Sequence, residues 1–352
     1  MEKQLSSLNF RKSTDPEKVF DEITRRVNDA EIMAEINEKF NFSGDKSFIE
    51  SFKENYTSNI DNSSIFNRTL FDVDIEALDA DQIYTIAAET IVMKYGRPSL
   101  LIQNGKFEKP ESDVWKGRLH HDSILDNIPS VGRIELQNHA TYDWVGTGWL
   151  LENSEYLITN RHVAKVFAKK NGNSFVFKQN LEGRTIKSFI DYKEEFGVDE
   201  ESSFRIDEIV HIAKPNEPDV AIMRVNPNNL DGQILPEGLK ISDVPASLNS
   251  YVYTLGYPAK DSRIRDSSLM ERIFKSVYNV KRLAPGKLIN TNSYDYEYHH
   301  DCSTLGGNSG SPVIDLQSGK VVGLHHAGTY RKYNWAVQCE YLLELITSLS
   351  LV

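Results

Sequence analysis

The chain has 352 residues, of which 39% are hydrophobic and 26% charged, and both proportions are ordinary for a soluble globular protein. Its formal net charge of −11 repels polyanions, which excludes a general electrostatic affinity for nucleic acids or anionic membranes. No segment approaches the roughly 20 apolar residues that a membrane-spanning helix requires. The length predicts two domains, and we expect neither a nucleic-acid nor a membrane partner.

The N-terminus and the cysteines indicate the compartment. The first residues carry no apolar core segment and no small-residue cleavage site, so the sequence shows no signal peptide. There are only two cysteines, Cys302 and Cys339. Few cysteines and no export signal favour a reducing cytoplasm, and we predict a cytoplasmic protein with two free thiols. A Cys302–Cys339 bridge is the alternative.

The sequence pattern of residues 1–127 predicts a helical, acidic domain. Apolar residues recur at helical spacing across residues 15–40. A second helix is expected over residues 79–95, where Gly96 and then Pro98 end it. The region holds 24 acidic and 16 basic residues, so most of the net charge lies in it. Such charge is typical of a solvated helical surface, and a docking surface for a partner or sensor is the alternative.

From residue 128 onward the pattern changes to short strands. Apolar and aromatic runs alternate with turn residues, which indicates a sandwich or barrel. The runs are WVGTGWLL, EYLITN, SFVF, FRIDEIVHI, DVAIMRV, YVYTLGY, GKLINT, GSPVID and KVVGLHH. The closing stretch VQCEYLLELITSL predicts a C-terminal helix. We therefore predict a mainly β domain over residues 128–352.

The segment STLGGNSGSPVID holds a serine, Ser309, in a setting that suits a nucleophile. A serine hydroxyl reacts when a base removes its proton and when donors stabilise the oxyanion that develops. The glycines around Ser309 permit backbone torsions closed to other residues. A tight turn can then aim the amides of Gly307 and Ser309 at one point, as an oxyanion hole. The alternative is a glycine-rich surface turn.

Two further motifs supply a base and a partner for it. In LITNRHVA, His162 follows an apolar run and precedes a short helix, a position that holds an imidazole rigidly. Asp219 begins the run DVAIMRV, and a buried aspartate there can accept the imidazole N–H and fix its tautomer. Taken singly, His162 suits a structural histidine equally well, and Asp219 suits a turn residue after Pro218.

The order of the three residues decides between the known triad arrangements. His162, Asp219 and Ser309 follow the chymotrypsin order, whereas α/β-hydrolases run Ser…Asp…His and subtilisins Asp…His…Ser. The separations of 57 and 90 residues place base and aspartate in the first half of the β region and the nucleophile in the second. GNSGS is also not the G-x-S-x-G elbow, because residue 311 is serine.

The segments that carry these residues resemble those of bacterial trypsin-like serine peptidases that are poor in disulfides, akin to glutamyl endopeptidases and HtrA proteases. They are GTGWLL, LITNRHV, PDVAIMRV, GYPA, GGNSGSPV and VVGLHHAG. The resemblance covers about residues 128–350. It implies a chymotrypsin-like double antiparallel β-barrel with the active site in the cleft between the barrels, here preceded by the α-helical domain. It also implies a serine endopeptidase that cleaves protein substrates through an acyl-enzyme and needs no cofactor.

The same resemblance suggests the substrate-binding residues. In glutamyl endopeptidases, a threonine five residues before the nucleophile and a histidine after it hold the P1 carboxylate, and Thr304 and His325 stand at the matching positions. Hydroxyl and imidazole donors bind a carboxylate or an amide, so we expect cleavage after Glu, or after Gln or Asp. The alternative is that His325 is a packed strand histidine, with His326 on the opposite face of a regular strand.

Asn308 departs from the digestive trypsins. Their zymogens activate when a freed N-terminus pairs with an aspartate directly before the nucleophile, and an asparagine cannot supply that charge. We therefore expect activity that does not depend on such a cleavage.

The last expectations concern how the activity is regulated and which other functions the chain could have. A cytoplasmic protease must be restrained, so we expect region 1–127 to inhibit, sense or recruit an activator protein, as in a bacterial stress or defence effector. A pseudoprotease or scaffold that binds partners without cleavage is the alternative, and a cytosolic esterase is another. No metal is expected, because the histidine pairs at 120–121 and 299–300 lack cysteines or carboxylates at ligand spacing.

Overall fold

The computed structural model describes residues 27–40, 90–260, 267–292, 296–329 and 333–351. The chain forms two compact units, residues 1–96 and residues 97–352. Composition alone predicts a boundary at residue 127, some thirty residues later. The difference arises because two strands between residues 97 and 127 pair within the second unit, and short strands of this kind leave little local signal.

In the first unit, helix α2 (Ala30–Lys39) lies within the predicted helix over residues 15–40. Residues 28–29, within the range of the expected helix, are not helical. Asn28 has a positive φ of 35°, and the Asp29 side chain caps α2 by accepting a hydrogen bond from the Ile32 amide at 3.4 Å. Residues 90–96 are helical and end at Gly96, as expected. The remaining parts of both predicted helices lie outside the described residues.

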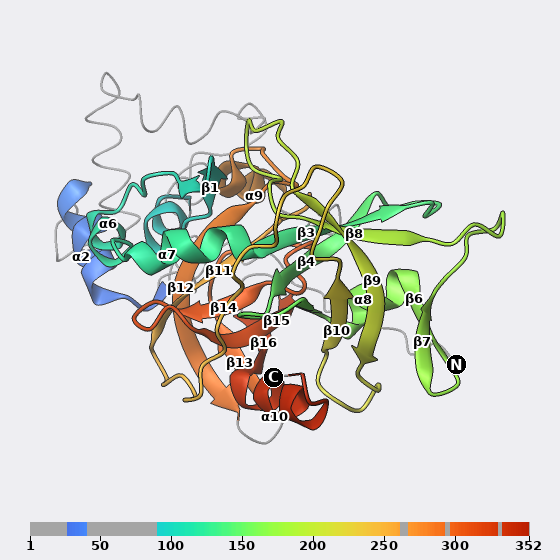
Figure 1. Cartoon of the computed structure of the whole chain (residues 1–352). Coiled ribbons are helices and arrows are strands. Elements are labelled where there is room, and N and C mark those ends of the chain that lie inside the picture. Colours follow the sequence, from blue (N-terminus) through green and yellow to red (C-terminus); the bar gives the residue numbers. More distant parts are fainter. Residues whose placement is uncertain (1–26, 41–89, 261–266, 293–295, 330–332, 352) are drawn as a thin grey trace, which may run out of the picture. The chain divides into compact units, whose positions relative to one another are not determined.

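The second unit contains the predicted double barrel. The first barrel is closed and antiparallel, with six strands in the ring order β10-β5-β4-β3-β8-β9. Figure 1 shows these strands in green and yellow. Their bounds are β3 (Val131–Gln137), β4 (Trp144–Leu150), β5 (Tyr156–Thr159), β8 (Lys187–Asp191), β9 (Ser203–Ile212) and β10 (Ala221–Val225).

The second barrel follows the ring order β11-β14-β15-β16-β13-β12 and closes through the pairing of β11 with β12. Figure 1 shows it in orange and red. Its strands are β11 (Tyr251–Gly256), β12 (Arg282–Asn292), β13 (Glu297–His300), β14 (Pro312–Asp315), β15 (Val321–Thr329) and β16 (Tyr333–Gln338). Strands β1 (Leu100–Gln103) and β2 (Lys106–Phe107) extend this sheet from β12. The predicted mainly β, chymotrypsin-like fold is therefore confirmed.

Helices and one hairpin complete the second unit. The hairpin joins β6 (Ala168–Asn171) to β7 (Ser174–Phe177). The helices are α6 (Asp113–Arg118), α7 (Asp122–Asn127), the 3-10 turn η3 (Ile128–Ser130), α8 (Arg161–Phe167), α9 (Ser267–Phe274) and α10 (Cys339–Ser348). α10 confirms the predicted C-terminal helix. Among the described residues, no helix combines the length and apolar character that crossing a membrane demands.

Each barrel has its own apolar interior. In β3 the burial alternates after the first two residues, as a strand with one face on a core requires. Ile134, Leu157 and Phe204 are fully buried inside the first barrel. Cys302 is buried inside the second barrel, and Cys339 is buried at the start of α10. Both cysteines are free, so the predicted pair of thiols is found rather than the bridge.

Candidate active site

His162 lies where the sequence predicts it, between a strand and a short helix. Strand β5 ends at Thr159, and α8 begins at Arg161. His162 Nδ1 lies 2.6 Å from Asp219 Oδ2, and the His162 amide donates to Asp219 Oδ1 at 3.1 Å. The Asn160 side chain also donates to the Asp219 carbonyl oxygen at 2.9 Å. Three bonds therefore hold the start of α8 against the residues before β10.

The surroundings of Asp219 keep it ionised. Burial alone would raise the pKa of this carboxyl, but the hydrogen bond and charge of His162, together with Arg161, outweigh burial and lower it. Arg161 Nε lies 3.6 Å from Asp219 Oδ1. A carboxylate at Nδ1 places the proton of a neutral imidazole on that nitrogen and leaves Nε2 with a free lone pair. The pair is thus arranged as a general base with its orienting partner.

Ser309 lies in a tight turn whose glycines are required by geometry. Gly307 and Gly310 have φ angles of 89° and 91°, a region that L side chains rarely adopt. A Cβ at Gly310 would lie 2.0 Å from the Thr147 carbonyl oxygen, and one at Gly307 would lie 2.3 Å from that of Tyr257. The turn is fastened to β4, because Thr147 donates its amide to the Ser309 carbonyl at 2.9 Å and its hydroxyl to the Gly307 carbonyl at 2.8 Å.

A glycine of β4 brings the base and the nucleophile turn close together. A Cβ at Gly146 would lie 2.9 Å from Val163 Cγ2 and 3.0 Å from the Ser309 carbonyl oxygen. Val163 directly follows His162, so α8 and the turn meet across this glycine. Within the described ranges, the structure brings His162 and Asp219 into hydrogen bonding and records no bond between His162 and Ser309. Such a bond commonly tightens only when substrate is present.

The amides predicted to form an oxyanion hole are available as donors. Among the residues that the structure describes, the N–H groups of Gly307 and Ser309 donate to no protein acceptor. Asn308 between them is buried and makes neutral bonds, donating to the Leu305 carbonyl at 3.3 Å and accepting from the Ser311 hydroxyl at 3.5 Å. The turn is therefore held by uncharged contacts at the position where digestive trypsins carry an aspartate.

Thr304 and His325 belong to one group of polar side chains in the second barrel. Thr304 donates its hydroxyl to Asn334 Oδ1 at 2.9 Å, and Asn334 Nδ2 donates to the Cys302 carbonyl at 2.7 Å. His300 pairs with Asn334 across β13 and β16, and His300 Nε2 lies 3.1 Å from His325 Nδ1. Asn334 was not among the predicted site residues, and His300 was predicted only not to bind a metal. The sequence signal for Asn334 was a polar residue between two aromatic residues of β16, and His300 lies in the mostly polar strand EYHH, which gave no such signal.

His325 and His326 do not alternate as in a regular strand. The register of β15 against β16 shifts between His325 and Ala327, so a bulge lies at His326. His325 is 3% exposed, and burial, with the nearby histidines 300, 326 and 162, lowers its pKa well below the usual value. His325 is therefore a neutral imidazole at neutral pH. His326 Nε2 lies 3.3 Å from Glu297 Oε1 instead.

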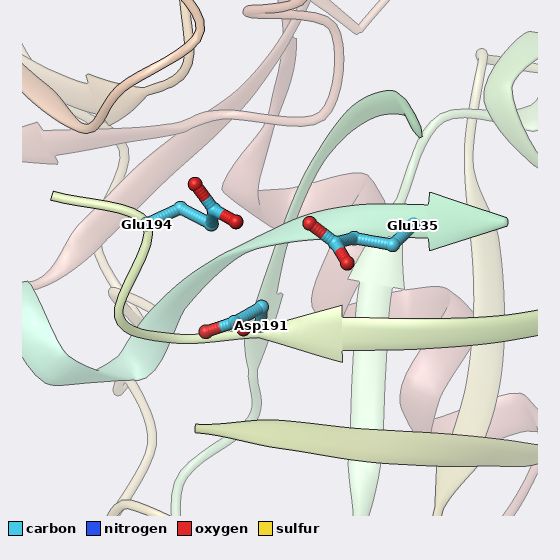
Figure 2. A group of neighbouring side chains, drawn as sticks. All are labelled: Glu135, Asp191 and Glu194. Atoms are coloured by element: carbon cyan, nitrogen blue, oxygen red, sulfur yellow. The ribbon is translucent and has the colours of Figure 1, made fainter. Parts of the chain in front are cut away.

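Three carboxylates gather at β3 and β8, outside the groups just described. Figure 2 shows Glu135 and Glu194 turned toward one another, with Asp191 beside them, and one oxygen of each lies within 4.8 Å of the others. Arg133 Nη2 lies 2.6 Å from both Glu135 Oε1 and Glu194 Oε1. The Lys193 amide donates to Asp191 Oδ1 at 2.7 Å. The Arg133 guanidinium and the Lys193 amide already bond to these three side chains, so we assign the group no metal.

One protein family and several known proteins are similar to this chain. The family described as trypsin-like peptidase domain matches residues 146–324. A probable serine protease of Lysobacter enzymogenes is 28% identical over 294 residues, which cover 74% of each chain. A glutamyl endopeptidase of Staphylococcus epidermidis is 33% identical over 129 residues, which are 36% of this chain and 39% of that protein. The serine endoprotease structure from Yersinia pestis aligns with a TM-score of 0.44 at 13% identity, covering 69% of this chain and 68% of that one.

Proposed function

This chain belongs to the trypsin-like peptidase domain family and is a serine protease, and we propose that His162, Asp219 and Ser309 form its catalytic triad. The observation that carries the proposal is the 2.6 Å contact between His162 Nδ1 and the partly buried carboxylate of Asp219. It is supported by the glycine turn that holds Ser309 next to the start of α8. Its substrates are proteins or peptides.

The reaction follows from these contacts. Ser309 Oγ attacks the scissile carbonyl carbon, and His162 Nε2 takes the hydroxyl proton and then passes it to the leaving amine. The C–N bond breaks, and an ester to Ser309 remains. Water then attacks the ester with His162 again as base, which releases the acid and restores the serine. The amides of Gly307 and Ser309 stabilise the oxyanion in both steps.

We also propose that Thr304 and His325 select the P1 side chain, with cleavage after Glu or Gln. The support is that Thr304, Asn334, His300 and His325 are linked by hydrogen bonds and strand pairing, and that His325 donates its amide to the Ser311 carbonyl at 2.9 Å. The strand that carries His325 is therefore bonded directly to the turn that holds Ser309. Hydrogen-bonding side chains at such a group discriminate between polar P1 residues more sharply than apolar ones do.

A peptide library tests both parts of the proposal. Full-length wild type and Ser309→Ala are incubated with a library that presents every residue at P1, and the new termini are identified by mass spectrometry. We expect cuts after Glu or Gln from wild type and none from Ser309→Ala. Cuts after Lys or Leu would reject the roles of Thr304 and His325 while leaving the protease. Equal cutting by Ser309→Ala would reject the triad.

We further propose that the acidic N-terminal region restrains or recruits this activity in a reducing cytoplasm, in response to a partner protein. The support is the concentration of negative charge in residues 1–127 and the two free, buried thiols. Because β1 and Arg97 belong to the second unit, a deletion that tests regulation should end at residue 96. Unchanged activity and unchanged partner capture after removal of residues 1–96 would reject the regulatory role. Fractionation of cells that express the tagged chain tests the compartment.

A further inference from the structure

The orientation of one buried amide determines what Thr304 can offer to a substrate. Asn334 is 5% exposed, and its side chain bridges the Cys302 carbonyl and the Thr304 hydroxyl. A backbone carbonyl only accepts hydrogen bonds, so the atom at 2.7 Å from the Cys302 oxygen must be the NH₂ group of Asn334. Its Oδ1 atom therefore faces Thr304.

The Thr304 hydroxyl therefore donates its proton within the protein and can only accept a hydrogen bond from a substrate. A hydroxyl has one proton, and Asn334 Oδ1 takes it at 2.9 Å because that oxygen has no proton to give. The Thr304 oxygen keeps its lone pairs for other partners. A carboxylate has only acceptor oxygens, so it finds no proton at Thr304, whereas the NH₂ of a carboxamide can donate to it.

His325 can bond to a carboxamide in either of its neutral forms, and in one of them it cannot bond to a carboxylate. Its Nδ1 is engaged with His300 Nε2 at 3.1 Å, and among the described residues no protein group bonds to its Nε2. If His300 donates within that contact, His325 Nε2–H can donate to a carboxamide or to a carboxylate, and this form does not discriminate between them. If His325 donates, Nε2 accepts from the amide NH₂. Burial keeps His325 uncharged, so it offers no cation to balance a carboxylate.

The backbone of β15 lets the Asn334 amide lie directly against it. Gly328 pairs with Asn334 across β15 and β16 and is exposed to solvent. A Cβ at Gly328 would lie 2.4 Å from Asn334 Oδ1 and 3.9 Å from Thr304 Oγ1. A larger residue would collide with the amide, so glycine at residue 328 is required for Asn334 to keep this orientation.

We propose that Asn334 is a specificity-determining residue that makes the P1 site select the carboxamide of Gln over the carboxylate of Glu. The inference rests on the proposed function, since it requires Thr304 and His325 to contact the P1 side chain. When Glu is at P1, the Thr304 oxygen receives no hydrogen bond from the substrate side chain. A missing hydrogen bond of this kind lowers kcat/KM by about 10- to 100-fold. We expect a Gln preference of that size over Glu.

Internal competition measures this preference directly. Two peptides that differ only in Gln or Glu at P1 are mixed, cleaved by the full-length protein and quantified by mass spectrometry. The ratio of their kcat/KM values does not depend on how much of the enzyme is active, so a poorly folding variant remains informative.

Two variants and one control identify the source of the preference. Asn334→Leu frees the Thr304 proton and Thr304→Val removes the acceptor, and each is expected to reduce the Gln-to-Glu ratio about tenfold or more. The control is Gln338→Leu on the same strand, because Gln338 also donates its side-chain amide to a backbone carbonyl, that of Glu297, at 2.8 Å. This change is expected to alter both rates equally and to leave the ratio unchanged.

The outcomes separate the inference from the function on which it rests. A wild type that cuts the Glu peptide as fast as the Gln peptide, or faster, overturns the inference and leaves the protease and its polar P1 site in place. A Gln preference that survives both Asn334→Leu and Thr304→Val overturns the role of Asn334. Cleavage of neither peptide, or cutting at other residues, rejects the proposed P1 specificity itself and the inference with it.

Discussion

Replacement of Arg97 by methionine is expected to destabilise the second unit strongly. Arg97 Nη2 donates to Asp301 Oδ2 at 2.7 Å, and both side chains are fully buried. Asp301 Oδ1 also accepts from the Lys287 amide at 2.7 Å, and the Ser303 hydroxyl donates to the Arg97 carbonyl at 2.6 Å. The pair thus ties the start of the unit to the segment that leads to Thr304 and Ser309.

The magnitude follows from burial. Removal of one partner leaves an uncompensated charge in the interior, which costs about 3–5 kcal/mol of the free energy of unfolding. For a domain of this size, 1 kcal/mol shifts Tm by about 2–4 °C, so the expected fall in Tm for Arg97→Met is roughly 6–20 °C. Differential scanning calorimetry of the full-length protein measures it.

A double variant and a surface control test the reasoning. Arg97→Met combined with Asp301→Asn removes the stranded charge and keeps an acceptor for the Lys287 amide, so it is expected to be more stable than Arg97→Met alone. The control is Lys116→Met, which breaks the partly exposed pair with Asp113 and is expected to change stability by less than about 1 kcal/mol. A double variant less stable than the single one, or no difference between Arg97→Met and the control, would refute the argument.

Three further predictions concern the catalytic groups and the carboxylate group. Asp219→Asn is expected to lower kcat by about four orders of magnitude, because the wrong imidazole tautomer then faces Ser309, while KM changes little in steady-state assays. Gly310→Ala is expected to abolish activity, since its Cβ would lie 2.0 Å from a backbone oxygen at a φ of 91°; circular dichroism separates loss of the turn from unfolding. Burial raises the pKa of Glu194 to about 7 from an ordinary 4.5, with the charges of Glu135 and Asp191 adding to the rise against Arg133. The folded chain therefore holds a proton that the unfolded chain releases, so stability falls as pH rises from about 4.5 to 7. Glu194→Gln should flatten this part of the Tm–pH curve, and a wild-type curve that rises over the same range would contradict the assignment.

The barrels could be predicted from the sequence because their strands are local patterns. Apolar runs between turn residues predict β4, β5, β10 and β15 directly. The contact between His162 and Asp219 also follows from motifs, since each residue stands at a strand end whose position the pattern fixes. Such features require no knowledge of which distant segments pair.

The features that could not be predicted depend on long-range pairing. β1 is a four-residue strand whose partner, β12, lies about 180 residues later, and local periodicity cannot reveal that partner. Asn334 faces His300 only through the register of β13 and β16, and a shift of one residue would turn its side chain to the other face. By contrast, the non-helical conformation of Asn28 and Asp29 could have been predicted, because asparagine and aspartate favour a cap over a helix interior.

The proposed triad requires the His162–Asp219 pair to activate Ser309. The most direct test is intact-mass analysis of the full-length protein after reaction with a fluorophosphonate, which modifies only an activated serine. We expect one adduct on wild type, mapped to Ser309 by peptide sequencing, and none on Ser309→Ala. Equal labelling of Ser309→Ala, or an unmodified wild type under conditions that label trypsin completely, would contradict it.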